Sequence, residues 1–383
     1  MYSFFKKHIR YLVWVILVVA MLPHGAASAH HDVRYYDPGS PVYRDIWVDP
    51  VAGADSNDGT TSATALAHIS AAWEQIPADV PLTTTGYRIW LQPGTYDASQ
   101  IPVRWQGRRG TAQYPIEIRA ASGAGSVTFT QALDFDTVAY IYLYDITVAP
   151  APAATYALSC HECSYVVVRG SAVQGGGIVA TQSHHMAIED SQIANSPAAG
   201  VLWSAVRESH IQNTQIQTSG AACMQLNAGS ATIRIEASTM SGCGTYGVVT
   251  GPESTLEAMR SPWIHYEAYD VTIANNVIMH TNNAGIGVYG GFNIAAAYNT
   301  LYDVGGTTTA LAFGQARRKC AGIIESTTPS CSAQLMRGGW GTNNDTSPGE
   351  PIPNRDVYVY NNIIVNPAGT HNTAQLCITA GVA

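Results

Sequence analysis

Groups that can bind or transform a sugar are concentrated in two polar segments, at about residues 250–269 and 306–354. An aromatic ring can stack on the C–H face of a sugar while charged groups bind its hydroxyls. We expect His280 and Tyr289, which lie between the segments, to face the same site. The candidates within the segments are Arg260, Trp263, His265, Tyr266, Glu267, Lys319, Arg337, Trp340, Asp345 and Glu350.

The first residues have the features of a secretory signal. Lys6, Lys7 and Arg10 precede an apolar run over residues 11–22, and Ala27-Ser28-Ala29 forms an A-x-A cleavage pattern. The run is shorter than the roughly 20 apolar residues that span a bilayer. We therefore predict that residues 1–29 are removed, that the mature chain begins near His30 and that it is secreted, with a periplasmic or cell-surface location as alternatives.

The charge of the mature chain excludes some partners. Removing three of the 19 basic residues leaves 16 against 27 acidic ones, and Lys319 is then the only lysine. Nucleic acids and anionic membranes need a basic face, so we expect neither as a partner. We expect a monomer.

The region 30–115 is predicted to cap the start of the domain. A short strand at 46–48 precedes a turn rich in Asp, Asn and Gly, and residues 63–76 carry apolar side chains at helical spacing. Asp55, Asn57 and Asp58 offer oxygen ligands for calcium, but the spacing of an EF-hand loop is missing. We favour turn formation and helix capping for them, and the chain's metal ligands stay unknown.

From residue 116 to 383 the sequence repeats. Short apolar strands recur, and most of the steps between their closing positions lie between 20 and 25 residues. Such a period without a helical pattern indicates stacked units. We predict an all-β fold, a right-handed parallel β-helix with an N-terminal capping helix. The closing positions are Val148, Val173, Ile193, Ile216, Met240, Ile278, Leu301 and Ile364.

A second column of residues supports this register. The position two before each closing residue is polar and small in all but the first repeat. Side chains at equivalent positions stack in parallel coils, and amides can form a hydrogen-bonded ladder. The column is Ile146, Ser171, Ser191, Thr214, Ser238, Asn276, Asn299 and Asn362.

The seven cysteines permit disulfides in an exported chain. Cys320 and Cys331 would close a short loop, and Cys223 and Cys243 lie about one repeat apart. For the C-x-x-C pair Cys160 and Cys163, no second metal-binding motif is present. We favour a local disulfide or two free thiols there, and Cys377 is left over.

The segment from 48 to 96, with GADSNDGT and RIWLQPGTY, and the coils VTIANNVI and VYVYNNIIVN resemble secreted pectate-lyase-like β-helix proteins. The resemblance covers roughly residues 46–383. It implies the fold but no single reaction, because the superfamily contains lyases, hydrolases, epimerases, esterases and non-catalytic proteins.

The resemblance implies a site built by loops that project from the coils. We expect a polysaccharide lyase acting on a uronate-containing glycan. Lys319 or Arg337 would take the proton, Arg260 or a calcium ion would neutralise the uronate, and His265 or Tyr266 would protonate the leaving oxygen. Alternatives are a glycoside hydrolase, although no acidic pair stands out in the sequence, and a non-catalytic glycan-binding or adhesion module.

The C-terminal end has no recognisable capping segment after the apolar residues 376–379. Stacked coils need a cap that protects the last strand edges. We therefore expect that the chain continues beyond Ala383 in its full-length form.

Overall fold

The computed structural model describes residues 39–251, 253–255, 258–260, 266–319, 342–343, 352–367 and 374–379. These residues belong to one compact unit, Pro38–Ala383. The predicted signal segment lies outside the described residues. Among the residues described, no helix is both long enough and apolar enough to cross a bilayer.

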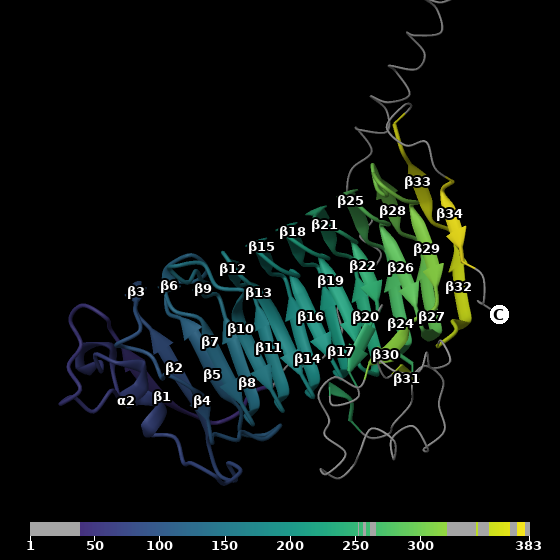
Figure 1. The fold of residues 1–383 in the computed structure, drawn as a ribbon. Helices are drawn as coiled ribbons and strands as arrows, with labels where there is room; N and C mark the ends of the chain where they lie inside the picture. Colours follow the sequence, from purple (N-terminus) through teal and green to yellow (C-terminus); the bar gives the residue numbers. More distant parts are fainter. Residues whose placement is uncertain are drawn as a thin grey trace, which may run out of the picture. The chain divides into compact units, whose positions relative to one another are not determined.

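Three parallel sheets run along the unit, and the chain visits them in turn, coil after coil (Figure 1). Sheet A contains β1 Tyr43–Val48, β2 Gly86–Leu91, β5 Ile116–Ala120, β8 Ala139–Tyr144, β11 Ser164–Arg169, β14 His184–Glu189, β17 Arg207–Gln212, β20 Ser230–Glu236, β24 Ala268–Ala274, β27 Gly291–Ala297 and β32 Arg355–Tyr360.

Sheets B and C follow sheet A within each coil. Sheet B contains β3 Gly94–Tyr96, β6 Val127–Phe129, β9 Thr147–Val148, β12 Ala172–Gln174, β15 Gln192–Ser196, β18 Gln215–Ser219, β21 Thr239–Cys243, β25 Val277–Thr281, β28 Thr300–Tyr302 and β33 Ile363–Val365. Sheet C contains β4 Trp105–Gln106, β7 Leu133–Asp136, β10 Tyr156–His161, β13 Gly177–Thr181, β16 Val201–Ser204, β19 Met224–Asn227, β22 Val248–Thr250, β26 Ile286–Tyr289, β29 Leu311–Gly314 and β34 Leu376–Ile378.

This arrangement confirms the predicted fold class. Each strand pairs in parallel with the equivalent strand of the next coil, as in Val168 beside Ile188 and Ile188 beside Ile211. Side chains alternate between the two faces of a strand, so the apolar positions of every coil meet in one continuous core. Among the described residues, helix is confined to two short segments between β1 and β2.

The predicted N-terminal helix is shorter than expected. A 3-10 turn, Ser62–Thr64, and helix α2, Ile69–Glu74, replace a single helix over 63–76. The backbone breaks between them because Leu66 forms a bridge with Val48 at the end of β1. Asp55 accepts hydrogen bonds from the backbone N–H groups of Ala67 and His68, just before α2 begins. It therefore supports the turn that leads into the helix, and the helix itself has no side-chain cap.

The polar column forms the predicted ladder. Asn276 accepts from the backbone N–H of Ser238 at 3.0 Å and donates to Ile235 O at 2.8 Å and to Asn299 Oδ1 at 3.0 Å. Asn299 repeats this pattern with Asn362 at 2.9 Å. In earlier coils Ser and Thr hydroxyls serve the same turn. The ladder therefore satisfies buried backbone groups where sheet A turns into sheet B.

Positive backbone φ angles also repeat from coil to coil. Tyr140, Tyr165, His185 and Glu208 occupy the same place in β8, β11, β14 and β17, with φ between 50° and 56°. A non-glycine residue rarely adopts this conformation. Because it recurs at one place in neighbouring coils, it belongs to the fold and bends the strands of sheet A from β8 onward at the same point.

One cysteine pair is a disulfide. Cys223 and Cys243 are bonded across neighbouring coils, as their spacing predicted. Cys160 and Cys163 are buried, unbonded thiols, which agrees with the second of the two sequence-based alternatives. The predicted pair Cys320 and Cys331 lies outside the described residues.

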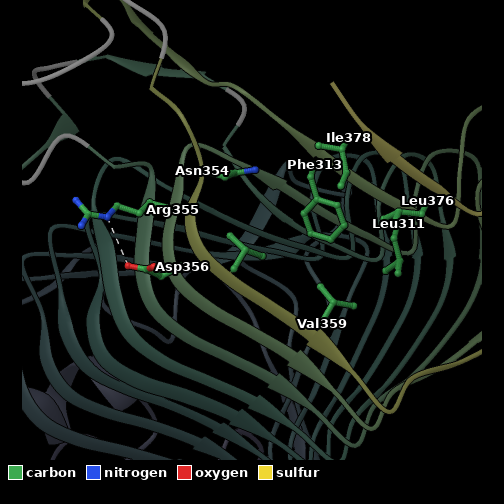
Figure 2. Close-up of a pocket in the computed structure, with 9 residues that line it drawn as sticks. Leu311, Phe313, Asn354, Arg355, Asp356, Val359, Leu376 and Ile378 are labelled. Atoms are coloured by element: carbon green, nitrogen blue, oxygen red, sulfur yellow. Dashed lines mark ion pairs between the residues drawn. The ribbon is translucent and has the colours of Figure 1, made fainter. Parts of the chain in front are cut away.

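The last described coil exposes part of its inward face. Leu376 and Ile378 of β34 are 49% and 60% exposed. Figure 2 shows them beside Leu311 and Phe313 of the preceding coil at a cavity of about 390 Å³. The ion pair of Arg355 with Asp356 stands at the rim of this cavity. Its largely apolar lining does not resemble a sugar site.

The ladder gives a prediction about stability. Asn276→Ala removes three hydrogen bonds of a buried side chain and leaves backbone groups unpaired, so the free energy of unfolding should fall by about 3 kcal/mol. Urea unfolding measures this change. Asn282→Ala is the control, because Asn282 is exposed and donates one hydrogen bond to Gly244 O. Equal losses in both variants would contradict a structural role for the ladder.

The disulfide gives a second prediction. It links residues 20 apart, and a cross-link over such a loop contributes about 3 kcal/mol in the chain-entropy model. The double variant Cys223→Ala, Cys243→Ala should lose about this much in urea unfolding. A non-reducing peptide map should contain the linked peptide, and alkylation of both thiols without reductant would refute the bond.

Candidate functional site

The described strands of the two insertions pair with one another. The first contributes β23, Glu253–Thr255, and the second contributes β30, Arg317–Lys319, and β31, Thr342–Asn343. These three strands form a small parallel sheet, visible below β24 in Figure 1. The second insertion begins later than predicted, because β29 occupies residues 311–314 within the range 306–354.

After β23 the first insertion runs back along earlier coils. Met259 packs against Ala205 and Ala228, which lie in the turns between sheets C and A. Arg260 forms an ion pair with Glu162, in the turn that follows β10. The Arg207 guanidinium donates to Arg260 O at 3.1 Å. The insertion therefore brings a cation to the edge of sheet C, several coils before its own.

Lys319 and Arg260 are held by different elements. Arg260 pairs with Glu162, after β10, whereas the backbone of Lys319 pairs with Thr255 of β23 and Asn343 of β31. Their expected joint action on one sugar unit stays a prediction.

Tyr266 and Glu267 are buried. Tyr266 is 6% exposed, and its ring stacks on Phe292 at 5.1 Å. Glu267 is fully buried, and its Oε2 accepts hydrogen bonds from Ala228 N at 3.0 Å and Ser254 Oγ at 2.7 Å. Both side chains hold the insertion on the coils. Their buried positions do not fit the catalytic role predicted for Tyr266 or the substrate-binding role predicted for Glu267.

His280 and Tyr289 face different sides. His280 belongs to β25 of sheet B, where its Nδ1 lies 3.0 Å from Asp303 Oδ2. Tyr289 belongs to β26 of sheet C, and its hydroxyl lies 3.1 Å from that of Tyr246. Only Tyr289 is therefore on the sheet that leads into the insertions. The other predicted site residues lie outside the described part: Trp263, His265, Arg337, Trp340, Asp345 and Glu350.

The outer face of sheet C carries a row of polar side chains that the sequence reasoning missed. Strand register places them at equivalent positions in successive coils, each directly after an inward apolar residue. The sequence signal that could have revealed this row is the polar residue at the end of each of these strands. The row consists of Asp136, His161, Thr181, Ser204 and Asn227.

Two contacts organise the start of this row. The exposed His161 lies with its Nδ1 2.9 Å from Thr181 Oγ1. Arg104 contacts Asp134 at 3.2 Å and Asp136 at 3.4 Å. The two aspartates occupy alternate positions of β7 and therefore point to one side. They form the acidic pair that the sequence reasoning did not recognise.

The C-x-x-C segment divides between core and surface. Cys160 and Cys163 are buried in the core, whereas His161 and Glu162 are exposed. The hydrogen bond with Cys163, together with burial, raises the pKa of the Cys160 thiol well above its ordinary value. A neutral, buried thiol is a poor nucleophile, so the chemistry of this segment rests on His161 and Glu162.

A buried ion cluster stands on the outer side of sheet A. Glu189 lies 2.5 Å from Arg169 Nε and 2.7 Å from His210 Nε2, and all three side chains are at most 12% exposed. Burial raises the pKa of the Glu189 carboxyl, but the hydrogen bonds from His210 and Arg169 outweigh burial and lower it overall. The Arg169 guanidinium also lies over the Tyr144 ring at 5.4 Å. This cluster ties three coils together.

Comparisons with known proteins agree on the fold. Residues 156–327 match the family model described as a right handed beta helix region. No curated protein matches the sequence. The structure is similar to an alginate lyase from Paenibacillus sp. str. FPU-7, with a TM-score of 0.50 and 16% identity over 73% of this chain and 93% of the lyase.

Two further solved structures are more distant. A pectate lyase has a TM-score of 0.42 and 16% identity, covering 77% of this chain and 83% of its own. A lacto-N-biosidase of family GH136 from Eubacterium ramulus has a TM-score of 0.44 and 11% identity, covering 87% of this chain and 65% of its own. Among these structures the alginate lyase supports the fold, and its 16% identity leaves the reaction open.

The ion cluster gives a prediction of pH dependence. Because the pKa of Glu189 is lower in the folded state, its contribution to stability is complete above the unfolded value of about 4.3 and disappears as the pH falls through the folded value. Glu189→Gln should therefore destabilise the protein at pH 7, and the difference from wild type should narrow below pH 4. Urea unfolding between pH 3 and 7 tests this.

The control for this series is Glu236→Gln, because Glu236 pairs with Arg234 at the surface. Exposed ion pairs contribute little, so this variant should follow the wild-type pH profile. A constant difference between wild type and Glu189→Gln across the whole pH range would show that the ionised carboxylate is not the stabilising form.

Proposed function

The chain is a right-handed parallel β-helix protein, and we propose that it is a secreted polysaccharide lyase that cleaves a uronate-containing glycan. The observation that carries the proposal is the placement of Arg260. In an acidic chain, the first insertion folds back to put this cation beside Glu162, next to the exposed His161 on sheet C. A cation near an exposed imidazole would supply two of the three functions that elimination from a uronate requires, namely neutralisation of the carboxylate and removal of the α-proton.

The reaction would proceed by β-elimination. Arg260, with Arg207 at its carbonyl, would bind the uronate carboxylate and make the α-proton more acidic. His161 would take the α-proton through a ring nitrogen, the C–O bond at the β-carbon would break as the C=C bond forms, and the leaving oxygen would take a proton from solvent. The hydroxyls of Thr181 and Ser204 continue the row along sheet C and would bind neighbouring sugar units.

Lys319 and Arg337 were the bases expected from the sequence. Lys319 lies on β30 of the small sheet, whereas Arg260 pairs with Glu162 after β10, so we assign Lys319 to another part of a long glycan. Arg337 lies outside the described residues, and its role stays a prediction.

Calcium is the alternative partner of the uronate. Its preferred ligands are carboxylate and carbonyl oxygens. The acidic pair on β7, Asp134 and Asp136, contacts the Arg104 guanidinium. These two residues therefore fit a cationic side chain better than a calcium ion, and the proposed chemistry uses arginine.

The same acidic pair favours a second candidate, a glycoside hydrolase. Hydrolysis uses two carboxyl groups that flank one bond, and Asp134 and Asp136 point to one face of β7. In that case the reaction would take place at the N-terminal end of the polar row and would depend on Arg104.

The proposal predicts the products. The secreted protein should convert a uronate polysaccharide into fragments whose unsaturated-uronate absorbance rises together with reducing ends. His161→Ala should lower kcat by about 10²–10⁴, and Arg260→Ala should lower kcat/KM for uronate substrates. The matched controls are His68→Ala and Arg234→Ala, whose side chains pair with Asp55 and Glu236 away from sheet C.

The outcomes separate the candidates. Reducing ends without absorbance, lost in Asp134→Asn or Asp136→Asn, would replace the lyase by the hydrolase. Glycan binding without any product would favour a binding module. Loss of activity in chelator with Arg260→Ala unaffected would overturn the role of arginine and assign the uronate to a calcium ion.

A further inference from the structure

Two adjacent histidines on β14 point to the same side of sheet A. In an extended strand, consecutive side chains point to opposite faces, and His184-His185 would be split between them. Here His185 has a φ of 56°, and its Nδ1 lies 2.8 Å from Nδ1 of His184. The bend that the fold imposes on the coils from β8 onward therefore turns a dipeptide into a pair of convergent nitrogens.

The next coil adds a carboxylate. Glu208 occupies the position of His185 in β17, with a φ of 50°. Its Oε2 lies 3.2 Å from Nδ1 of His185. One ligand atom from each of the three side chains lies within 4.8 Å of the others.

These separations match a metal coordination sphere. When a metal ion binds nitrogen and oxygen ligands at 2.0–2.1 Å, neighbouring ligand atoms are about 3.0–3.4 Å apart. The observed 2.8 Å and 3.2 Å require only small adjustments of exposed side chains. The third pair, His184 and Glu208, has ligand atoms within 4.8 Å, so side-chain rotation would bring all three ligand atoms to one ion.

Aromatic packing fixes the imidazole rings. The Tyr165 ring stacks on His185 with centroids 4.2 Å apart and contacts His184 edge-on at 5.7 Å. Tyr140 stacks on Tyr165 in turn at 4.1 Å. Orientation of a ligating ring by its neighbours raises metal affinity, since less freedom is lost on binding.

We propose that His184, His185 and Glu208 form a binding site for a divalent transition metal ion, with zinc as the best-suited class. Two imidazoles and one carboxylate are ligands that zinc prefers, whereas calcium and magnesium prefer oxygen alone. Three protein ligands leave one tetrahedral position for water or another ligand. The proposal goes beyond the proposed reaction and does not depend on it.

Neighbouring charges influence the expected affinity of the site for the metal ion. Arg207 pairs in register with His184, and Arg260 lies against Arg207. These cations lower the affinity for a second positive ion, so we expect a site weaker than a closed, four-ligand structural one.

Isothermal titration with zinc chloride tests the site. The untagged mature chain is first treated with chelator and dialysed. His30 and His31, near the expected mature N-terminus, are replaced by Gln in every protein compared, because adjacent histidines there also bind zinc. One equivalent of zinc should bind, and His185→Asn and Glu208→Gln should each weaken binding by at least about tenfold.

The matched control is His280→Asn. His280 also has a positive φ, 55°, and its Nδ1 also faces a carboxylate of the next coil, Asp303. It lacks a second histidine, so its replacement should leave the isotherm unchanged. Asn tolerates the same backbone conformation at both positions, which separates ligand loss from backbone strain.

Thermal melting supplies a second measurement. A ligand that binds only the folded state raises the melting temperature, so zinc should raise it in the wild type and in His280→Asn but not in His185→Asn. Identical zinc isotherms for wild type and His185→Asn, or the absence of zinc binding by the wild type, would overturn the proposal and leave a hydrogen-bonded cluster. Neither result would bear on the glycan assay, which needs no zinc.

Discussion

Parallel pairing between equivalent strands of successive coils is the constraint on which this structure depends. It fixes one coil above the next at about 4.8 Å, so every side chain stands above its counterpart in the preceding repeat. Apolar counterparts form the core, and Asn276, Asn299 and Asn362 form the ladder. A residue's position in the repeat thus decides its environment, and its coil number decides where along the sheets it lies.

This constraint explains how well the sequence predicted the fold. The period, the apolar register and the polar ladder are properties of the repeat itself, and they are visible without knowledge of distant contacts. The helix over 63–76 was overestimated because a long-range contact, the bridge of Leu66 with Val48, competes with local helical spacing. The start of the second insertion was misjudged because β29 belongs to sheet C, whereas the ladder marks the turn between sheets A and B.

The site was less predictable, for two physical reasons. The path of an insertion depends on what it packs against, so no local pattern announced that Arg260 would reach Glu162, 98 residues earlier. Strand alternation also fails where φ is positive, as at His185, so simple counting separates side chains that in fact converge. Glu267 shows a further difference. It was predicted to bind substrate as a polar residue of an insertion, but its side chain is fully buried and accepts hydrogen bonds.

Stacking also determines what the surface can recognise. A polymer that lies along sheet C meets equivalent positions at regular intervals, and the row from Asp136 to Asn227 offers it carboxylate, imidazole, hydroxyl and amide groups in succession. The chain is acidic as a whole, so an anionic glycan would be repelled except where cations gather. Arg207 and Arg260 meet at the turn beside this row. Under the proposed function, the fold-back of one insertion sets the place on the sheet where a uronate would approach.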